Sequence, residues 1–143
     1  MSMWVSPIDL QVLNCAMQNT VIEYLGIVFT KVESASLTAT MRVTEKILQP
    51  MGIMHGGASC ILAETLGSVA ANYCVDQKVK ACVGLDININ HVRPVTSGTV
   101  TAVATPFHLG KTTHVWGIEI RNEEGKIVAI ARLTVAVIDA KRG

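Results

Sequence analysis

One carboxylate stands in a segment that otherwise carries no charge. From residue 51 to residue 75, Glu64 is the only Asp, Glu, Lys or Arg, and Ser68 follows it after one helical turn. A carboxylate with a hydroxyl neighbour in apolar surroundings has the environment of a general base or a nucleophile, because desolvation disfavours its charged form. The competing interpretation is an outward-facing glutamate on a half-exposed helix, and the pattern alone leaves both open.

The residues before this glutamate could bind a developing oxyanion. His55, Gly56 and Gly57 stand where a helix is expected to begin, and backbone N–H groups there lack intrahelical partners. Two glycines leave room for a polarised carbonyl oxygen at the positive end of the helix dipole. His55 and Gln49 could donate further neutral hydrogen bonds to that oxygen. A simple tight turn into the helix, with ordinary loop residues before it, fits the same pattern.

The spacing of these groups bears on assembly. Gly56 and Glu64 are eight residues apart, which is roughly 12 Å along a helix axis. An attacking group and an oxyanion donor should each lie about 3 Å from the same reacting carbonyl. One helix therefore cannot supply both to one substrate, whereas two antiparallel copies related by a two-fold axis could. If the site is real, we expect at least a dimer with shared active sites.

The other reactive side chains form no recognisable metal or disulfide pattern. His91 shares the parity of Leu85 and the two isoleucines after it, so we expect it on the apolar face of a strand, as a core residue or a ligand contact. His108 and His114 have no partner at a metal-ligand spacing and no HExxH is present, so we predict no metal. The four cysteines lack CxxC spacing and are interpreted as buried thiols: Cys15, Cys60, Cys74 and Cys82.

Length and composition predict a single domain covering residues 1–143. The net charge of +1 and a charged share of 16% give no reason to expect nucleic acid as a partner. A hydrophobic share of 50% is typical of a chain that hides part of its surface in an oligomer. The N-terminal residues lack the features of a signal peptide and no segment is long and apolar enough for a membrane span, so we expect a cytoplasmic protein with no membrane partner.

Periodicity predicts the elements that would position these groups. A short amphipathic helix is expected to start at Ser6, as its cap, and to run to Met17. Residues 96–98 and 122–125 are expected to be hairpin turns. Apolar and polar residues alternate, as in half-buried strands, over residues 36–43, 85–90, 99–105, 116–121 and 127–138.

A helix over about residues 57–75 is the only element long and apolar enough to cover the sheet. Tight turns between successive strands require mostly antiparallel pairing, and we expect an antiparallel meander of about four strands after this helix. The predicted fold class is therefore α+β, with a curved antiparallel β-sheet wrapped around one long central α-helix.

Several of these motifs recur, in order, in a known family. Gln49-Pro50-x-Gly52, His55-Gly56-Gly57-Ala58, Leu62-Ala63-Glu64-Thr65 and Gly67-Ser68 resemble the hotdog-fold acyl-CoA thioesterases of the PaaI-like group. Three downstream motifs are similar to the branch that hydrolyses dihydroxynaphthoyl-CoA or aryl thioesters of acyl carrier proteins in siderophore synthesis. These motifs are residues 83–88, residues 90–94 and residues 108–110. The resemblance covers nearly the whole chain.

The resemblance implies a role for each candidate residue. Glu64 would be the catalytic carboxylate and the Gly56 N–H the oxyanion donor, with His55 and Gln49 orienting the thioester carbonyl and Ser68 holding the attacking water or the carboxylate. The family assembles as dimers or dimers of dimers, with Gln49 to Gly56 from one subunit and Glu64 with Ser68 from its partner. Coenzyme A would be part of the substrate, with no separate cofactor, and its contacts would be Gly84, His91, Val92, Arg93, Pro94, His108, Leu109, Gly110, Lys111, Thr112 and Thr113.

Thioester hydrolysis needs little machinery, because the carbonyl is electrophilic and the thiolate leaves readily. One carboxylate and one or two hydrogen-bond donors can suffice. Whether Glu64 attacks the thioester directly or activates a water molecule stays open at the level of sequence. The alternative function is a non-catalytic module that binds acyl-CoA or an acyl carrier in the same pocket, and a hydratase on a related scaffold ranks below both.

Overall fold

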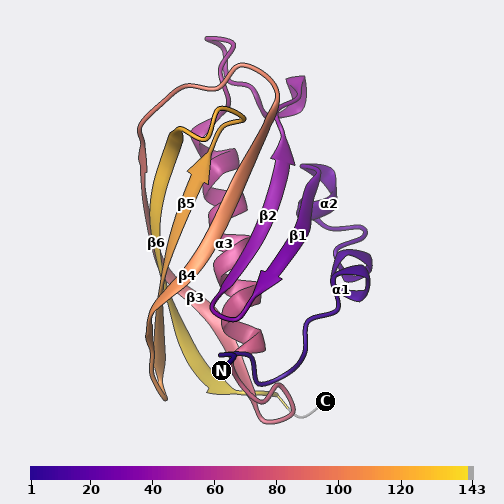
Figure 1. Cartoon of the computed structure of the whole chain (residues 1–143), viewed down its shortest axis with the longest axis vertical. Coiled ribbons are helices and arrows are strands. Elements are labelled where there is room, and N and C mark those ends of the chain that lie inside the picture. Colours follow the sequence, from indigo (N-terminus) through magenta and orange to yellow (C-terminus); the bar gives the residue numbers. More distant parts are fainter. Residues whose placement is uncertain (142–143) are drawn as a thin grey trace.

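The computed structural model, which describes residues 1–141, is built from one six-stranded antiparallel sheet and a long helix that lies against it (Figure 1). The sheet order is β1-β2-β4-β5-β6-β3. Two short helices pack outside β1. The elements are α1 (Leu10–Ala16), α2 (Val21–Tyr24), β1 (Ile27–Glu33), β2 (Ser36–Arg42), the 3-10 turn η1 (Glu45–Ile47), α3 (Gly56–Tyr73), β3 (Lys80–His91), β4 (Thr99–Leu109), β5 (Thr113–Arg121) and β6 (Ile127–Asp139).

The predicted central helix is confirmed within two residues at each end. α3 contacts every strand from β2 to β6, and its buried face includes Leu62, Leu66 and Ala70, none of which is exposed. Gly67 allows the closest approach, because a Cβ there would lie 2.6 Å from Leu133 Cδ2 on β6. The apolar core therefore fills the space between α3 and the sheet, and the predicted α+β class is confirmed.

The predicted four-strand meander after α3 is only partly right. β4, β5 and β6 follow one another in the sheet, but β3 lies at the edge beside β6. The residues 96–98 therefore do not form a hairpin turn, since they carry the chain from this edge back to the centre of the sheet. Gly98 does turn the chain, with φ at +84°, and its carbonyl accepts a hydrogen bond from Val43 N at 2.8 Å. Turn chemistry is local, whereas strand partners are set by the whole fold.

A β-bulge in β3 overturns one predicted face. The register of β3 against β6 shifts between Gly84 and Asp86, which leaves Leu85 as the extra residue with its side chain 64% exposed. Ile87 and Ile89 pack against the core as predicted, but Leu85 does not share their face. Because an extra residue reverses the alternation, Gly84 faces α3 together with these isoleucines.

The predicted start of the first helix is also corrected. α1 begins at Leu10, and its cap is Asp9, whose carboxylate accepts hydrogen bonds from Gln11 N at 2.9 Å and Val12 N at 3.1 Å. A carboxylate can cap two N–H groups at once, which explains why Asp9 rather than Ser6 marks the boundary. Within residues 1–141 no helix combines the length and the apolar character needed to cross a membrane.

Candidate active site

The start of α3 presents one free backbone donor. His55 is the N-cap, and its Nδ1 accepts a hydrogen bond from Gly57 N at 2.8 Å. This bond occupies the Gly57 N–H and fixes the neutral tautomer of His55, so its proton lies on Nε2. The N–H of Gly56, the first helical residue, has no intrahelical partner. Of the two glycines, Gly56 is thus the one whose N–H can bind a ligand oxygen.

Gln49 is held in a tight loop just before this helix. Its backbone N–H donates to Ile53 O at 2.9 Å, and its carbonyl accepts from Gly52 N at 2.8 Å. Gly52 has φ at +78°, a value that favours glycine. The side-chain Oε1 of Gln49 accepts a hydrogen bond from Met51 N. This bond holds the carboxamide oxygen and leaves its NH₂ group available as a donor.

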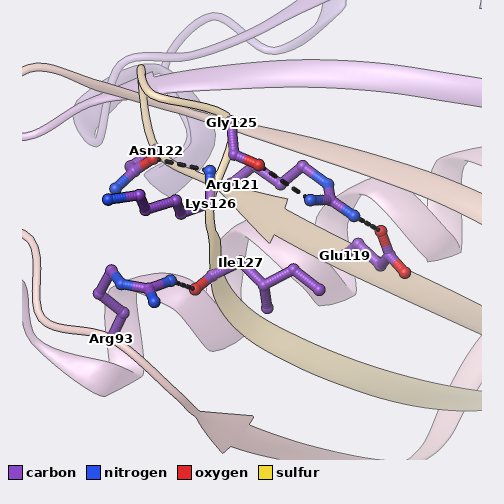
Figure 2. A network of polar contacts seen from close by, with 7 residues as sticks. All are labelled: Arg93, Glu119, Arg121, Asn122, Gly125, Lys126 and Ile127. Carbon is purple, nitrogen blue, oxygen red and sulfur yellow. Dashed lines mark hydrogen bonds and ion pairs between the residues drawn. The ribbon is translucent and has the colours of Figure 1, made fainter.

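The end of β3 packs against the same helix start. A Cβ on Gly56 would lie 2.7 Å from His91 Nε2, so only glycine permits this contact without a shift. Arg93 donates from Nη1 to Ile127 O at 2.7 Å, which ties the segment after β3 to the first residue of β6 (Figure 2). Beside it, the hairpin between β5 and β6 is closed by Arg121 Nη1 donating to Gly125 O and Lys126 N donating to Asn122 Oδ1 (Figure 2).

A cavity of about 430 Å³ joins several of the predicted residues. Gln49 and Gly56 line it from the loop and the helix start, and the segment His91, Val92, Arg93 and Pro94 lines it from the end of β3. Ser59 also lines it, although no pattern in the sequence points to this residue. His55 lines a separate hollow of about 270 Å³, together with Lys46 and Ile61. We call Gln49, His55, Gly56 and residues 91–94 the helix-start group.

Glu64 lies farther along α3, against the bulged edge strand. A Cβ on Gly84 would lie 2.7 Å from Glu64 Oε1, so the carboxylate sits directly over the glycine backbone. The side chain is exposed in the single chain, and Ser68, one turn later, is half-buried. Burial, together with the nearby Glu64 carboxylate, raises the pKa of the Cys60 thiol. Cys60 is therefore a protonated thiol at neutral pH, which argues against a catalytic cysteine here.

The loop between β4 and β5 lies at the Gly84 end of the sheet. Leu109 pairs with His114, His114 with Val135, and Val135 with Gly84, so these residues form one row across four strands. Within the loop, Gly110 N donates to Thr113 O at 2.9 Å, and Thr112 O accepts from Val137 N at 2.9 Å. The coenzyme A contacts predicted in this loop, residues 108–113, therefore lie several pairing positions away from His91, which pairs with Ala129. We call Glu64, Ser68 and Gly84 the helix-middle group.

His114, in this row, is buried. The absence of a metal-ligand spacing around it gave no reason to expect this burial. Burial, and to a smaller extent nearby His108, lower the pKa of its imidazole. Its Nδ1 and the indole nitrogen of Trp116 have no hydrogen-bond partner within residues 1–141. The alternation of residues along β5 places both side chains on the core face, and this alternation was the available signal.

Comparison with known proteins defines the class. Residues 51–129 match the family model of the Thioesterase superfamily, and the chain belongs to this family of hotdog-fold thioester hydrolases. A crystal structure of a mutant thioesterase from Pseudomonas aeruginosa superposes with a TM-score of 0.96 at 48% identity, covering 97% of this chain and 100% of that one.

Two curated relatives cover nearly the whole chain. A Vibrio cholerae protein classed as an esterase is 55% identical over 137 residues, which are 96% of this chain and 91% of its own. The 1,4-dihydroxy-2-naphthoyl-CoA hydrolase of Escherichia coli K12 is 42% identical over 135 residues, or 94% and 98%. The predicted family and the predicted thioester hydrolase activity are confirmed, and they take precedence over the non-catalytic and hydratase alternatives.

Proposed function

We propose that this chain hydrolyses aromatic or medium-chain acyl-CoA thioesters to a free acid and a thiol. 1,4-Dihydroxy-2-naphthoyl-CoA and aryl thioesters of an acyl carrier protein are the specific candidates. Support comes from the similarity to the Escherichia coli hydrolase named for the first substrate and to a proofreading thioesterase of Klebsiella pneumoniae, which is 39% identical. The cavity beside Gly56 is of the size that small-molecule sites have.

One observation carries the assignment of roles: α3 bears an unpaired N–H at Gly56 and, eight residues later, an exposed carboxylate at Glu64. We assign the Gly56 N–H to the developing oxyanion, with the Gln49 amide and His55 Nε2–H as further donors. We assign Glu64, supported by Ser68, to the attack. The oxygen of Glu64, or of a water it deprotonates, bonds to the carbonyl carbon. The C–S bond then breaks, and the thiolate leaves to be protonated. Attack by water gives the free acid at once, whereas direct attack by Glu64 leaves an anhydride that a water molecule then hydrolyses to the acid and the free carboxylate.

The two groups act together only across a dimer in this proposal. β3 is an edge strand of 12 residues, and the exposed Leu85 and Val83 leave apolar surface beside its unpaired backbone. Such an edge is suited to pairing with a second copy, which covers both features. The residues Gly84 and His91 to Pro94 then contact coenzyme A in sites shared between subunits, and a dimer of two such dimers is the larger assembly we propose.

The bulge suggests where the two-fold axis lies. With Leu85 counted out as the extra residue, Gly84 and His91 stand three pairing positions on either side of Asn88. An axis through Asn88 pairs Gly84 of one subunit with His91 of the partner subunit, on the same face of a continuous sheet. Because Gly84 contacts Glu64 and His91 contacts Gly56, this register brings the carboxylate of one chain toward the oxyanion donor of the other.

The decisive experiment is the Glu64→Gln variant, assayed by thiol release from benzoyl-CoA and from linear acyl-CoAs of increasing length. Removal of a catalytic carboxylate is expected to lower kcat by a factor on the order of 10²–10⁴. Glu45→Gln is the matched control, because Glu45 is also an exposed glutamate but lies on η1. Wild-type turnover by Glu64→Gln would refute the assigned role, whereas a preference for linear chains would decide the acyl class.

A further inference from the structure

Ser59, which lines the cavity beside Gly56, carries a buried hydroxyl without a partner. Ser59 is 1% exposed, and its Oγ makes no hydrogen bond within residues 1–141. Serines inside helices usually bond the carbonyl four residues earlier, so an unbonded Oγ at this position is uncommon. Leaving a hydroxyl buried and unpaired costs free energy that a ligand atom can recover.

Position on the helix defines what Ser59 can reach. It stands three residues after Gly56, on the same side of α3, and both line the cavity. Side chains on a helix lean toward its N-terminus, so the Cβ that bears the Ser59 hydroxyl leans toward the turn that begins at Gly56. A rise of about 4.5 Å separates the two residues along the axis. With a carbonyl oxygen bound at the Gly56 N–H, Ser59 meets the part of the acyl group next to that carbonyl.

The rest of the cavity wall is mixed. Met54, Val95 and Val128 are buried apolar residues that line it. Its other polar side chains are Gln49 on the loop and His91 and Arg93 at the end of β3, and His91 lies against Gly56. We propose that Ser59 is a specificity-determining residue, whose hydroxyl hydrogen-bonds an oxygen on the carbon β to the thioester carbonyl. Acyl groups of this class include β-hydroxyacyl chains and aromatic acids with an ortho hydroxyl.

This inference rests on the proposed acyl-CoA site but not on the role of Glu64, so the test measures binding. Phenacyl-CoA, 2-hydroxyphenacyl-CoA and 4-hydroxyphenacyl-CoA are thioethers that have no thioester bond to hydrolyse. Dissociation constants from calorimetry on the full chain are compared for wild type and Ser59→Ala. We expect wild type to prefer the 2-hydroxy ligand over phenacyl-CoA, and Ser59→Ala to reduce that preference about tenfold, the value of one hydrogen bond.

Ser36→Ala is the matched control. Ser36 is also buried, but its Oγ donates to Glu33 Oε2 at 3.0 Å, far from the cavity in the β1–β2 hairpin. Its loss should lower the thermal midpoint and leave ligand preference unchanged, whereas Ser59→Ala removes an unpaired hydroxyl and should not lower the midpoint of the free protein. Ser59→Cys, which nearly keeps the volume, is the second variant and should lose the same preference.

Three results would overturn the proposal. An equal loss for all three ligands would mean that Ser59 acts on the carbonyl itself. A loss confined to the 4-hydroxy ligand would mean that the hydroxyl reaches a more distant position. Unchanged preference in both Ser59 variants would mean that the hydroxyl does not contact the acyl group. None of these results depends on hydrolysis, so they are distinct from a failure of Glu64→Gln to lower thiol release.

Discussion

The helix-start group and the helix-middle group gather around two places on α3 but differ in how far a single chain completes them. At the helix start, hydrogen bonds fix the tautomer of His55 and the carboxamide of Gln49, and a cavity already exists beside Gly56. In the middle of the helix, Glu64 is exposed against an edge strand. The donors of an oxyanion site must be oriented before the reaction. A carboxylate beside an open sheet edge is not yet enclosed by protein on its other side. This difference supports the proposal that another subunit completes the second group.

The largest expected effect comes from placing the defects of the two groups in different subunits. Glu64→Ala and a Gln49→Ala/His55→Ala double variant should each be nearly inactive. After subunit exchange in equal amounts, half of the dimers are mixed, and each mixed dimer has one intact site. Thiol release should therefore recover to about a quarter of the wild-type rate. No recovery, despite exchange shown by mass spectrometry, would contradict shared sites.

A second mixture serves as the control for this experiment. Ser68 belongs to the same group as Glu64, so mixing Glu64→Ala with Ser68→Ala places a defect in every site. Its activity should not exceed the average of the two parents. A rise above that average would mean that Glu64 and Ser68 serve different sites, and the division into two groups would have to be redrawn.

The next effect concerns how the strand holds the carboxylate. In Gly84→Ala the new Cβ would lie 2.7 Å from Glu64 Oε1, so the carboxylate must move. Displacement of a reacting group by about 1 Å can cost up to 10²-fold, and we expect kcat to fall about 10- to 100-fold. The same substitution in the Glu64→Ala background should have almost no further effect, since the two residues act as one unit. Additive losses would show that Gly84 acts elsewhere, for example on coenzyme A.

Local patterns in the sequence predict most of the helix-start group. Two glycines after a histidine, one turn ahead of a long apolar run, identify the start of α3, and the rise of the helix then separates Gly56 from Glu64. The contact between Gly56 and His91 also follows the predicted parity of His91. These features depend on spacing within one element, and spacing is what a sequence shows directly.

The surroundings of Glu64 are harder to predict from spacing in the sequence. The bulge at Leu85 reverses the alternation along β3, and without it Gly84 would face away from α3. The placement of β3 at the sheet edge, rather than beside β4, depends on which strands pair across the whole chain. The unpaired hydroxyl of Ser59 is likewise a property of packing, because a serine in an apolar helix resembles any other small residue.

The smallest expected effect is a loss of stability in acid, caused by His114 at the end of the sheet that carries Gly84. Burial, and then His108, lower the pKa of His114, so near the ordinary value of about 6.5 the unfolded chain binds a proton that the folded chain does not. The free energy of unfolding should therefore fall as the pH drops below about 6.5. Each kcal/mol corresponds to a shift of about 2–4 °C in Tm for a chain of this size. His114→Phe should flatten the decrease in Tm between pH 7.5 and pH 5.5. An equally steep decrease in His114→Phe would assign the acid sensitivity to other groups.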